Sequence, residues 1–240
     1  FRRVLFRSRS KAINQNTSIN ANSFEYNKKL NTLNAKGDVK IKETIKNFVI
    51  LSEDITYFKN KEKFISQSKS EAFGENLNIK AEKFEYDKTL DIVNAYNNVI
   101  IQDNIEDLLI FAENITYLRN KEKIFTEGET KAVFQSKYNF KSKDTTLLRN
   151  QKILQSLERT VVTDDDDTVY NLDNFEYLIE KKLLKGNNVN IITNFNKDKS
   201  DKFIFSSGIF NLQNKKFSGK DTKVLLHKNI FQKEKEKFLE

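Results

Sequence analysis

The chain has 240 residues, a net charge of +8 and no Cys, Pro, Met or Trp. The lack of cysteine excludes a disulfide framework and thiol chemistry. No run of eighteen apolar residues occurs in the sequence, which excludes a membrane-spanning helix within it.

Residues 1–10, FRRVLFRSRS, differ from the rest of the chain and hold four of the seven arginines. We predict that they are a non-native leader, because the hexapeptide from Arg3 to Ser8 is one reading frame of a common sequencing adapter. A native basic segment is the alternative. Removing these four charges lowers the net charge from +8 to +4, and it weakens the case for a nucleic-acid partner.

From about Ile19 onward the chain repeats a unit of 29 to 33 residues. Each unit has an anchor residue, a polar turn, an apolar residue seven positions after the anchor and a small residue two positions later. The anchors are Tyr26, Tyr57, Tyr86, Tyr117, Leu147, Tyr177 and Phe210. The apolar positions are Leu33, Phe64, Val93, Ile124, Leu154, Leu184 and Phe217, and the small ones are Ala35, Ser66, Ala95, Thr126, Ser156, Gly186 and Gly219.

The repeat predicts antiparallel β-structure. Alternation such as Leu33, Ala35, Gly37 and Val39 has the period of a strand with one buried face. Turns rich in Asn, Asp and Lys, such as the segment from Asn60 to Lys63, reverse the chain between strands. We therefore expect one all-β domain over residues 11–231, built from about seven strand-turn-strand repeats. Residues 232–240 form a charged linker or the start of a following region.

Chemical sites are scarce. Lysines of the turns, Lys88 among them, are interleaved with acidic residues and are interpreted as solvated, so a nucleic-acid partner is not expected. The lone His227 has no second His or Cys to share a metal, and no Ser has an evident base beside it. The acidic run from Thr163 to Thr168 is interpreted as a charged loop, with a calcium site as the alternative. We expect no catalysis, no cofactor and no metal.

Two stretches resemble the OstA-like family of lipopolysaccharide-transport proteins. They are ANSFEYNKKLNTLNAKGDVKI, from Ala21 to Ile41, and IKAEKFEYDKTLDIVNAYNNVII, from Ile79 to Ile101. The family outline is A-x-x-x-x-Y, a turn, then A-x-G-x-V; Ala35, Gly37 and Val39 fit it, whereas Asn97 replaces the glycine in the second stretch. The length of the repeat resembles the N-terminal periplasmic part of the LptD family of LPS-assembly proteins.

The resemblance implies an elongated, V-shaped antiparallel β-jelly-roll whose apolar trough conducts lipopolysaccharide without chemistry, in the periplasm, attached to the outer membrane in the full-length protein. The expected trough residues are Ile50, Ile79, Phe84, Val93, Ile110, Ile115, Ile124 and Leu184. The small residues leave room either for a guest chain or for closer packing of the sheets. A structural or adhesive repeat protein with a closed core is therefore the alternative.

The implied partners are lipopolysaccharide, a bridge protein of the same fold at the N-terminal edge, and an outer-membrane barrel with its lipoprotein plug at the C-terminal edge. An array that does not close on itself leaves a strand for pairing at each end. The expected edge residues are Ala21, Phe24 and Tyr26 at one end, and Val224 and Leu226 at the other.

Overall fold

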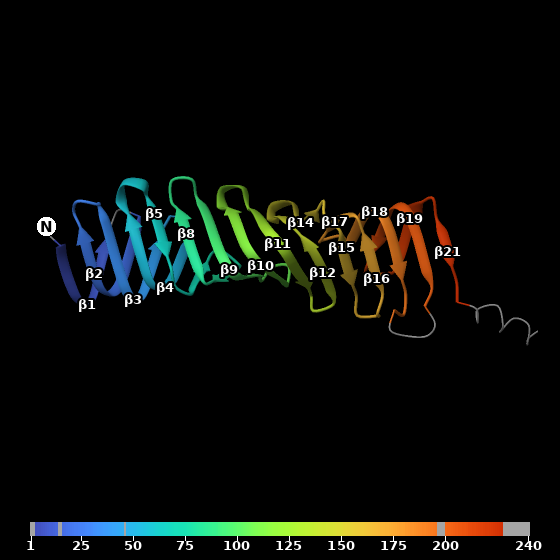
Figure 1. Ribbon diagram of the computed structural model, residues 1–240, viewed down its shortest axis with the longest axis horizontal. Helices are drawn as coiled ribbons and strands as arrows, with labels where there is room; N and C mark the ends of the chain where they lie inside the picture. Colours follow the sequence, from blue (N-terminus) through green and yellow to red (C-terminus); the bar gives the residue numbers. More distant parts are fainter. Residues whose placement is uncertain (1–2, 14–15, 46, 196–199, 228–240) are drawn as a thin grey trace, which may run out of the picture. The chain divides into compact units, whose positions relative to one another are not determined.

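The structure is a computed structural model that describes residues 3–13, 16–45, 47–195 and 200–227 (Figure 1). For residues 3–9 it describes the backbone alone. The chain divides into two compact units, Phe1–Thr130 and Lys131–Glu240. Each unit is described by itself below.

Unit 1 consists of antiparallel strands joined by short turns. The strands are β1 (Arg3–Ile13), β2 (Thr17–Asn27), β3 (Thr32–Glu43), β4 (Phe48–Phe58), β5 (Lys63–Ser66), β6 (Ser70–Phe73), β7 (Leu77–Ala81), β8 (Lys83–Asp87), β9 (Ile92–Asp103) and β10 (Leu108–Leu118). Two 3-10 turns, η1 (Lys59–Lys61) and η2 (Arg119–Lys121), follow β4 and β10, and β11 (Lys123–Phe134) crosses into unit 2.

The long strands of unit 1 bend near their middles, and each contributes to two layers. The pairing register shifts between Asn20 and Ser23 in β2 and between Lys36 and Val39 in β3. The first layer contains the halves that carry the Tyr anchors, including 23–27, 32–36 and 54–58 together with β5 and β8. The second layer contains the other halves, including 17–20, 39–43 and 48–52 together with β6 and β7. Because the strands fold over at the bend, the strand ends of both layers lie along one open edge.

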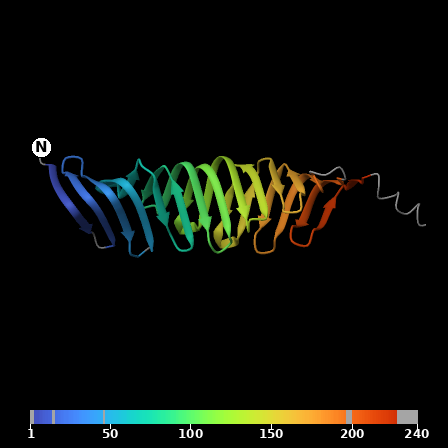
Figure 2. The ribbon, with the colours of Figure 1, turned by 90° about the horizontal axis from the view of Figure 1, so that it is seen from below.

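Unit 2 repeats this two-layer arrangement (Figure 2). Its strands are β12 (Tyr138–Lys143), β13 (Thr146–Leu148), β14 (Ile153–Ser156), β15 (Thr160–Thr163), β16 (Val169–Leu172), β17 (Asn174–Leu178), β18 (Leu183–Ile192), β19 (Lys202–Asn211), β20 (Lys216–Lys220) and β21 (Lys223–Leu225), with the 3-10 turn η3 (Arg149–Gln151) after β13. The first layer runs β13, β14, β17, β18, β19, β20, and the second runs β12, β15, β16, β18, β19, β21.

The turns of the first layer share one backbone conformation. The fifth residue after each anchor has a positive φ, at Asn31, Glu62, Asp91, Glu122, Lys152, Lys182 and Lys215. In unit 1 the anchor tyrosine also donates a hydrogen bond to that residue, as from Tyr26 Oη to Asn31 Oδ1 at 2.7 Å and from Tyr57 Oη to Glu62 Oε1 at 2.8 Å. The turn is thereby tied to the strand before it.

The inward columns predicted from the repeat are confirmed. Tyr86, Val93 and Ala95 are completely buried, and most of the corresponding positions of the other repeats are buried as well. The exceptions are the half-buried Tyr26, Leu33, Tyr57 and Gly186, and the exposed Phe217 and Gly219. The all-β, antiparallel fold is confirmed. There are more strands than the two expected for each repeat, because several strands break at the bend.

The small residues nine positions after the anchors allow the layers to pack closely at the bend. Ser66 Oγ lies 2.8 Å from Ser52 Oγ and from Ser70 Oγ, so buried hydroxyls satisfy one another where the register shifts. A Cβ on Gly186 would lie 2.4 Å from Leu172 Cδ2. At these positions, the alternative of close packing is the one that the structure favours over room for a guest chain.

The predicted N-terminal edge is wrong. Ala21, Phe24 and Tyr26 lie on β2, which pairs with β1 on one side and β3 on the other. Strand β1, Arg3–Ile13, is not expected from the sequence, because residues 1–10 are interpreted as a leader. Since β1 pairs with β2, it is the outer strand described at this end. At the other end, β21 pairs with β19, and its Val224 and Leu225 are 45% and 46% exposed, as is Leu226 at 43%. The domain boundaries at 11, 231 and 232 stay predictions, and residues 232–240 lie outside the described part.

Candidate functional site

The eight residues expected to line the trough all point inward, but they are packed. Each is at most 2% exposed: Ile50, Ile79, Phe84, Val93, Ile110, Ile115, Ile124 and Leu184. Aromatic rings fill the space between the layers of unit 1, with Tyr57 stacked on Phe64 at 4.5 Å and Phe48 edge-on to Tyr86 at 5.1 Å. The middle of this interior is therefore a filled apolar core in this structure.

The interior of unit 1 opens at its N-terminal end. A cavity of about 370 Å³ lies between the two layers there, within the size range of small-ligand sites. It is lined by Ala12, Ile13, Thr17, Ile19, Tyr26, Leu33, Tyr57, Lys59 and Phe64. Four residues of this lining, Tyr26, Leu33, Tyr57 and Phe64, are the first two members of the anchor and apolar columns, so the cavity continues the buried core outward. None of the eight predicted trough residues lines it.

The cavity has a polar rim. Tyr57 donates its hydroxyl to Glu62, and burial, followed by the hydrogen bond and charge of Glu62, raises the pKa of Tyr57 well above its usual range. The hydroxyl therefore stays protonated and neutral at physiological pH. Lys59, two residues after the anchor, is exposed and supplies a positive charge to the same rim.

Further along unit 1 a lysine bridges the layers across the open edge. Lys88 Nζ lies 2.7 Å from Thr17 Oγ1 and 3.5 Å from Glu43 Oε1, both on the second layer, and 3.7 Å from Glu62 Oε2. Thr17 also donates a hydrogen bond to Glu43, which is 1% exposed. The interpretation of Lys88 as a solvated turn residue is wrong, because its side chain is 18% exposed and neutralises this buried carboxylate.

Arg119 makes the corresponding bridge in the next repeat. Its guanidinium carbon lies 4.1 Å from the ring centroid of Phe48 on the second layer, a cation–π contact, and its Nη1 lies 2.7 Å from Asp91 Oδ1. Lys88 and Arg119 both stand two positions after a Tyr anchor. The basic residues two positions after the Tyr anchors thus close the open edge of unit 1. The recurrence of Lys or Arg at that position is the sequence signal that could have identified them.

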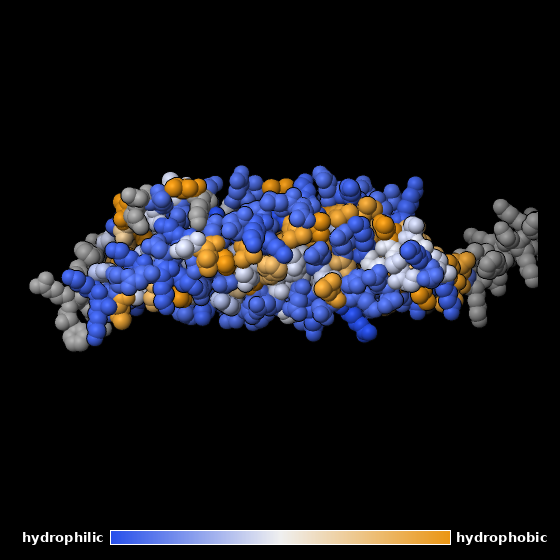
Figure 3. Space-filling view, turned by 90° about the horizontal axis from the view of Figure 1, so that it is seen from above, coloured by the Kyte–Doolittle hydropathy of each residue, from blue (hydrophilic) through white to orange (hydrophobic). Residues whose placement is uncertain are grey.

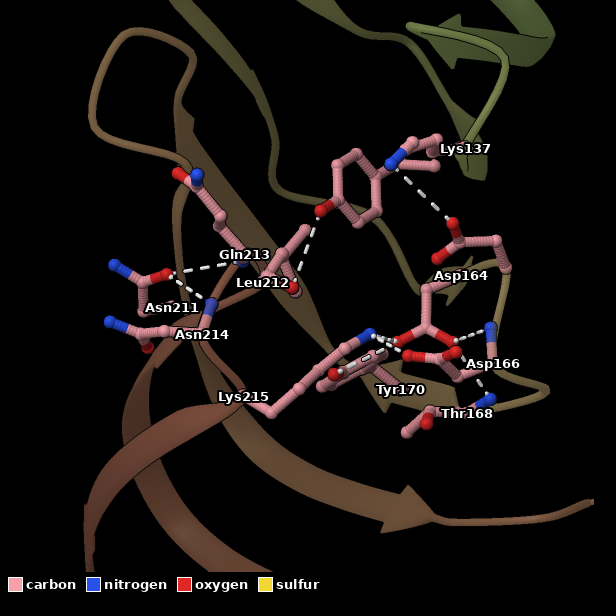
Figure 4. Close-up of polar contacts among 12 residues, drawn as sticks. Lys137, Asp164, Asp166, Thr168, Tyr170, Asn211, Leu212, Gln213, Asn214 and Lys215 are labelled. Carbon is pink, nitrogen blue, oxygen red and sulfur yellow. Dashed lines mark hydrogen bonds and ion pairs between the residues drawn. The ribbon is translucent and has the colours of Figure 1, made fainter.

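The last two repeats of unit 2 close the edge with different residues. The column that holds Lys88 and Arg119 continues with Arg149 in unit 2, but its next members are Ile179 and Leu212, which are 6% and 0% exposed. The cation moves to Lys215, five positions after the anchor, and binds Asp164 and, at 3.1 Å, Asp166 of the second layer (Figure 4). Burial opposes the charge of Lys215, but the hydrogen bonds and charges of these two carboxylates outweigh it and raise the pKa of Lys215. Tyr138 Oη donates to Leu212 O at 3.3 Å across the same gap.

The run from Asp164 to Asp166 is the one cluster of at least three possible metal-ligating side chains among the described residues. Its buried member, Asp164, accepts the N–H groups of Asp166 and Thr168, the Tyr170 hydroxyl and the Lys215 ammonium. Protein donors of this kind suit a structural carboxylate. The arrangement agrees with the charged-loop interpretation. His227 donates its backbone N–H to Asp201 Oδ1 at 2.8 Å.

The outer surface is mixed in character. In the space-filling view, apolar residues are scattered among hydrophilic ones on the face shown (Figure 3). Within the described ranges of the chain, no helix is long and apolar enough to cross a membrane.

Comparison with known proteins relates the first part of the chain to lipopolysaccharide assembly. Residues 3–104, fewer than half of the chain, match the family described as "Lipopolysaccharide-assembly, LptC-related". A search of curated proteins found no match. One solved structure among those similar to the chain is LptH from Pseudomonas aeruginosa, described as the LptA-homologous periplasmic component of its lipopolysaccharide transport device. It shows 9% identity and a TM-score of 0.29, over 63% of this chain and 94% of that one.

Proposed function

We propose that this chain is a non-catalytic periplasmic module that binds lipopolysaccharide between its two layers and passes it along the chain. The observation that carries the proposal is the match of residues 3–104 to a lipopolysaccharide-assembly family, in a unit whose apolar interior opens at one end. Each buried methylene of an acyl chain contributes roughly 0.8 kcal/mol, so an apolar passage holds a lipid without a specific contact.

The route and the partners are part of the same proposal. A bridge protein of the same fold adds a strand at the N-terminal end, now at β1, and the exposed strands β20 and β21 face an outer-membrane barrel and its lipoprotein plug. The unpaired groups of an outer strand are the chemical basis for such pairing. In this proposal the chain is the periplasmic part of an LptD-like protein, attached to the outer membrane.

A closed structural or adhesive repeat is the second candidate. Its support is the packing of the eight trough residues, each at most 2% exposed. Lipid can enter that core only if the layers separate, and the bridges made by Lys88 and Arg119 hold them together in unit 1.

Photo-crosslinking in cells separates the two candidates. A photoreactive residue at Phe84, Val93 or Ile115 should capture lipopolysaccharide, and one at the cavity position Leu33 should do so as well. Lys61, an exposed residue of η1, is the matched control that should capture none. Capture at Lys61 alone, or capture at no position in a folded protein, would refute the transport proposal and leave the closed repeat.

A further inference from the structure

The cations two positions after the Tyr anchors of unit 1 have unequal surroundings. Lys88 and Arg119 bind carboxylates and reach the second layer. Lys28 and Lys59 are exposed, and neither ammonium has a hydrogen bond or an ion pair to any residue within the described ranges. Within the described residues, these two positive charges at the N-terminal end of the column therefore have no anionic partner.

These two lysines lie on neighbouring turns. The backbone N–H of Lys59 donates a 3.1 Å hydrogen bond to the carbonyl oxygen of Asn31, which lies three positions after Lys28 in the same turn. Their strands, β2 and β4, flank β3, so the turns are spaced by about 10 Å along the open edge. Lysine is a common partner of phosphate, which it binds as a flexible point charge. A phosphorylated group can thus contact one or both side chains.

An accessible cavity adjoins the cation column at this end of unit 1. Lys59 lines the 370 Å³ cavity together with the side chains of Leu33, Tyr26 and Ile19. Behind Lys88 the corresponding interior is occupied by Tyr86 and Val93, which are completely buried. Positive charge and open apolar volume therefore coincide at Lys59.

We propose that this end of unit 1 is a binding site for an alkyl phosphate amphiphile, with the alkyl chain in the cavity and the phosphate on Lys59, assisted by Lys28. The inference deepens the proposed lipid-carrying function, on which it rests, by placing the charged group and the entry point of the ligand. The terminal methyl group of the ligand's alkyl chain points toward Phe64, and the phosphate headgroup stays in water at the open edge. The closed edge at Lys88 marks the far limit of the site.

Equilibrium binding of dodecyl phosphate below its micelle concentration, measured by isothermal titration calorimetry on the whole chain, tests the site. Lys59→Glu should weaken binding by about tenfold or more, because a charge-assisted hydrogen bond is replaced by repulsion. Lys61→Glu is the matched control, since it changes the net charge equally on the same exposed turn but does not line the cavity. It should change the affinity by less than about twofold.

Two further ligands separate the contributions of charge and chain. Inorganic phosphate should bind at least about a hundredfold more weakly than dodecyl phosphate, and Lys59→Glu should leave the affinity for dodecyl maltoside unchanged. Leu33→Trp, which fills the cavity, should abolish binding of both amphiphiles; it also supplies the only Trp of the chain as a reporter of folding.

Equal losses in Lys59→Glu and Lys61→Glu, or equal affinities for free and alkylated phosphate, would overturn the site. Failure of dodecyl phosphate to bind the parent chain would overturn it as well. If lipopolysaccharide is nevertheless captured at Val93 or Ile115 in cells, the proposed function survives and only this placement fails.

Discussion

Replacing Lys88 by Met should destabilise unit 1, because it leaves Glu43 buried without its cation. At the observed 3.5 Å between Lys88 Nζ and Glu43 Oε1, the pair attraction is about 5 kcal/mol for an effective dielectric constant near 20. Partial exposure of Lys88 and the cost of desolvating both ions reduce the net effect. We expect a loss of about 3 kcal/mol in the free energy of unfolding, near the lower end for a broken buried pair.

A double-mutant cycle isolates this interaction. Glu43→Gln alone should cost about 1 kcal/mol, because Lys88 keeps Glu62 at 3.7 Å and partial access to water. Lys88→Met in the Glu43→Gln background should cost about 2 kcal/mol less than it does in the parent, since no buried charge is then left alone. Urea unfolding followed by far-UV circular dichroism measures all four proteins, and an unchanged m-value shows that only stability has changed.

The exposed turn residue Lys61 provides the control for the loss of a lysine. Lys61→Met should change stability by less than about 0.5 kcal/mol. If Lys88→Met matches this small value, or if its effect adds to that of Glu43→Gln within about 0.5 kcal/mol, the bridge does not hold the layers together.

Three other outcomes are expected. Ile115→Asp should unfold unit 1, at a cost of about 4 kcal/mol or more, rather than block transport in a folded sheet, because Ile115 is 1% exposed; a native circular dichroism spectrum and melting curve would contradict this. Gly186→Ala should cost about 1–3 kcal/mol, because the new Cβ would lie 2.6 Å from Asn174 O, whereas Gly74→Ala, whose Cβ would have its nearest contact at 3.9 Å, is the control and should leave thermal unfolding nearly unchanged. Burial raises the pKa of Asp87, but the Leu90 N–H and the Lys63 ammonium outweigh it and hold that pKa below its usual range. The stabilisation from Asp87 is therefore complete above the unfolded pKa of about 3.9 and is lost as the pH falls through the folded pKa. Asp87→Asn should accordingly be less stable than the parent at pH 7, and the difference should shrink as the pH falls below about 4 in urea titrations. A difference that stays constant over this range would argue against this linkage.

Much of the fold could be predicted from the sequence because its information is local. An apolar residue seven positions after each anchor specifies which side chains share a face across a short turn, and this relation needs only the period of a strand. The columns starting at Tyr26, Leu33 and Ala35 were predictable for that reason. The residues five positions after the anchors adopt positive φ because the turn must close within that spacing.

The tertiary structure decided the features that depend on contacts between distant residues. Lys88 meets Thr17 across 71 residues of sequence and Lys215 meets Asp164 across 51, so turn lysines that look alike in the sequence differ in burial and partner. The bend that brings strand ends together also determines that the core is filled at Val93 yet open beside Lys59. The repeat predicts equivalent positions for all its copies, but the described copies differ in the residues that pack around them. The location of the cavity beside Lys59 depends on those tertiary contacts, which the sequence of a single repeat does not specify.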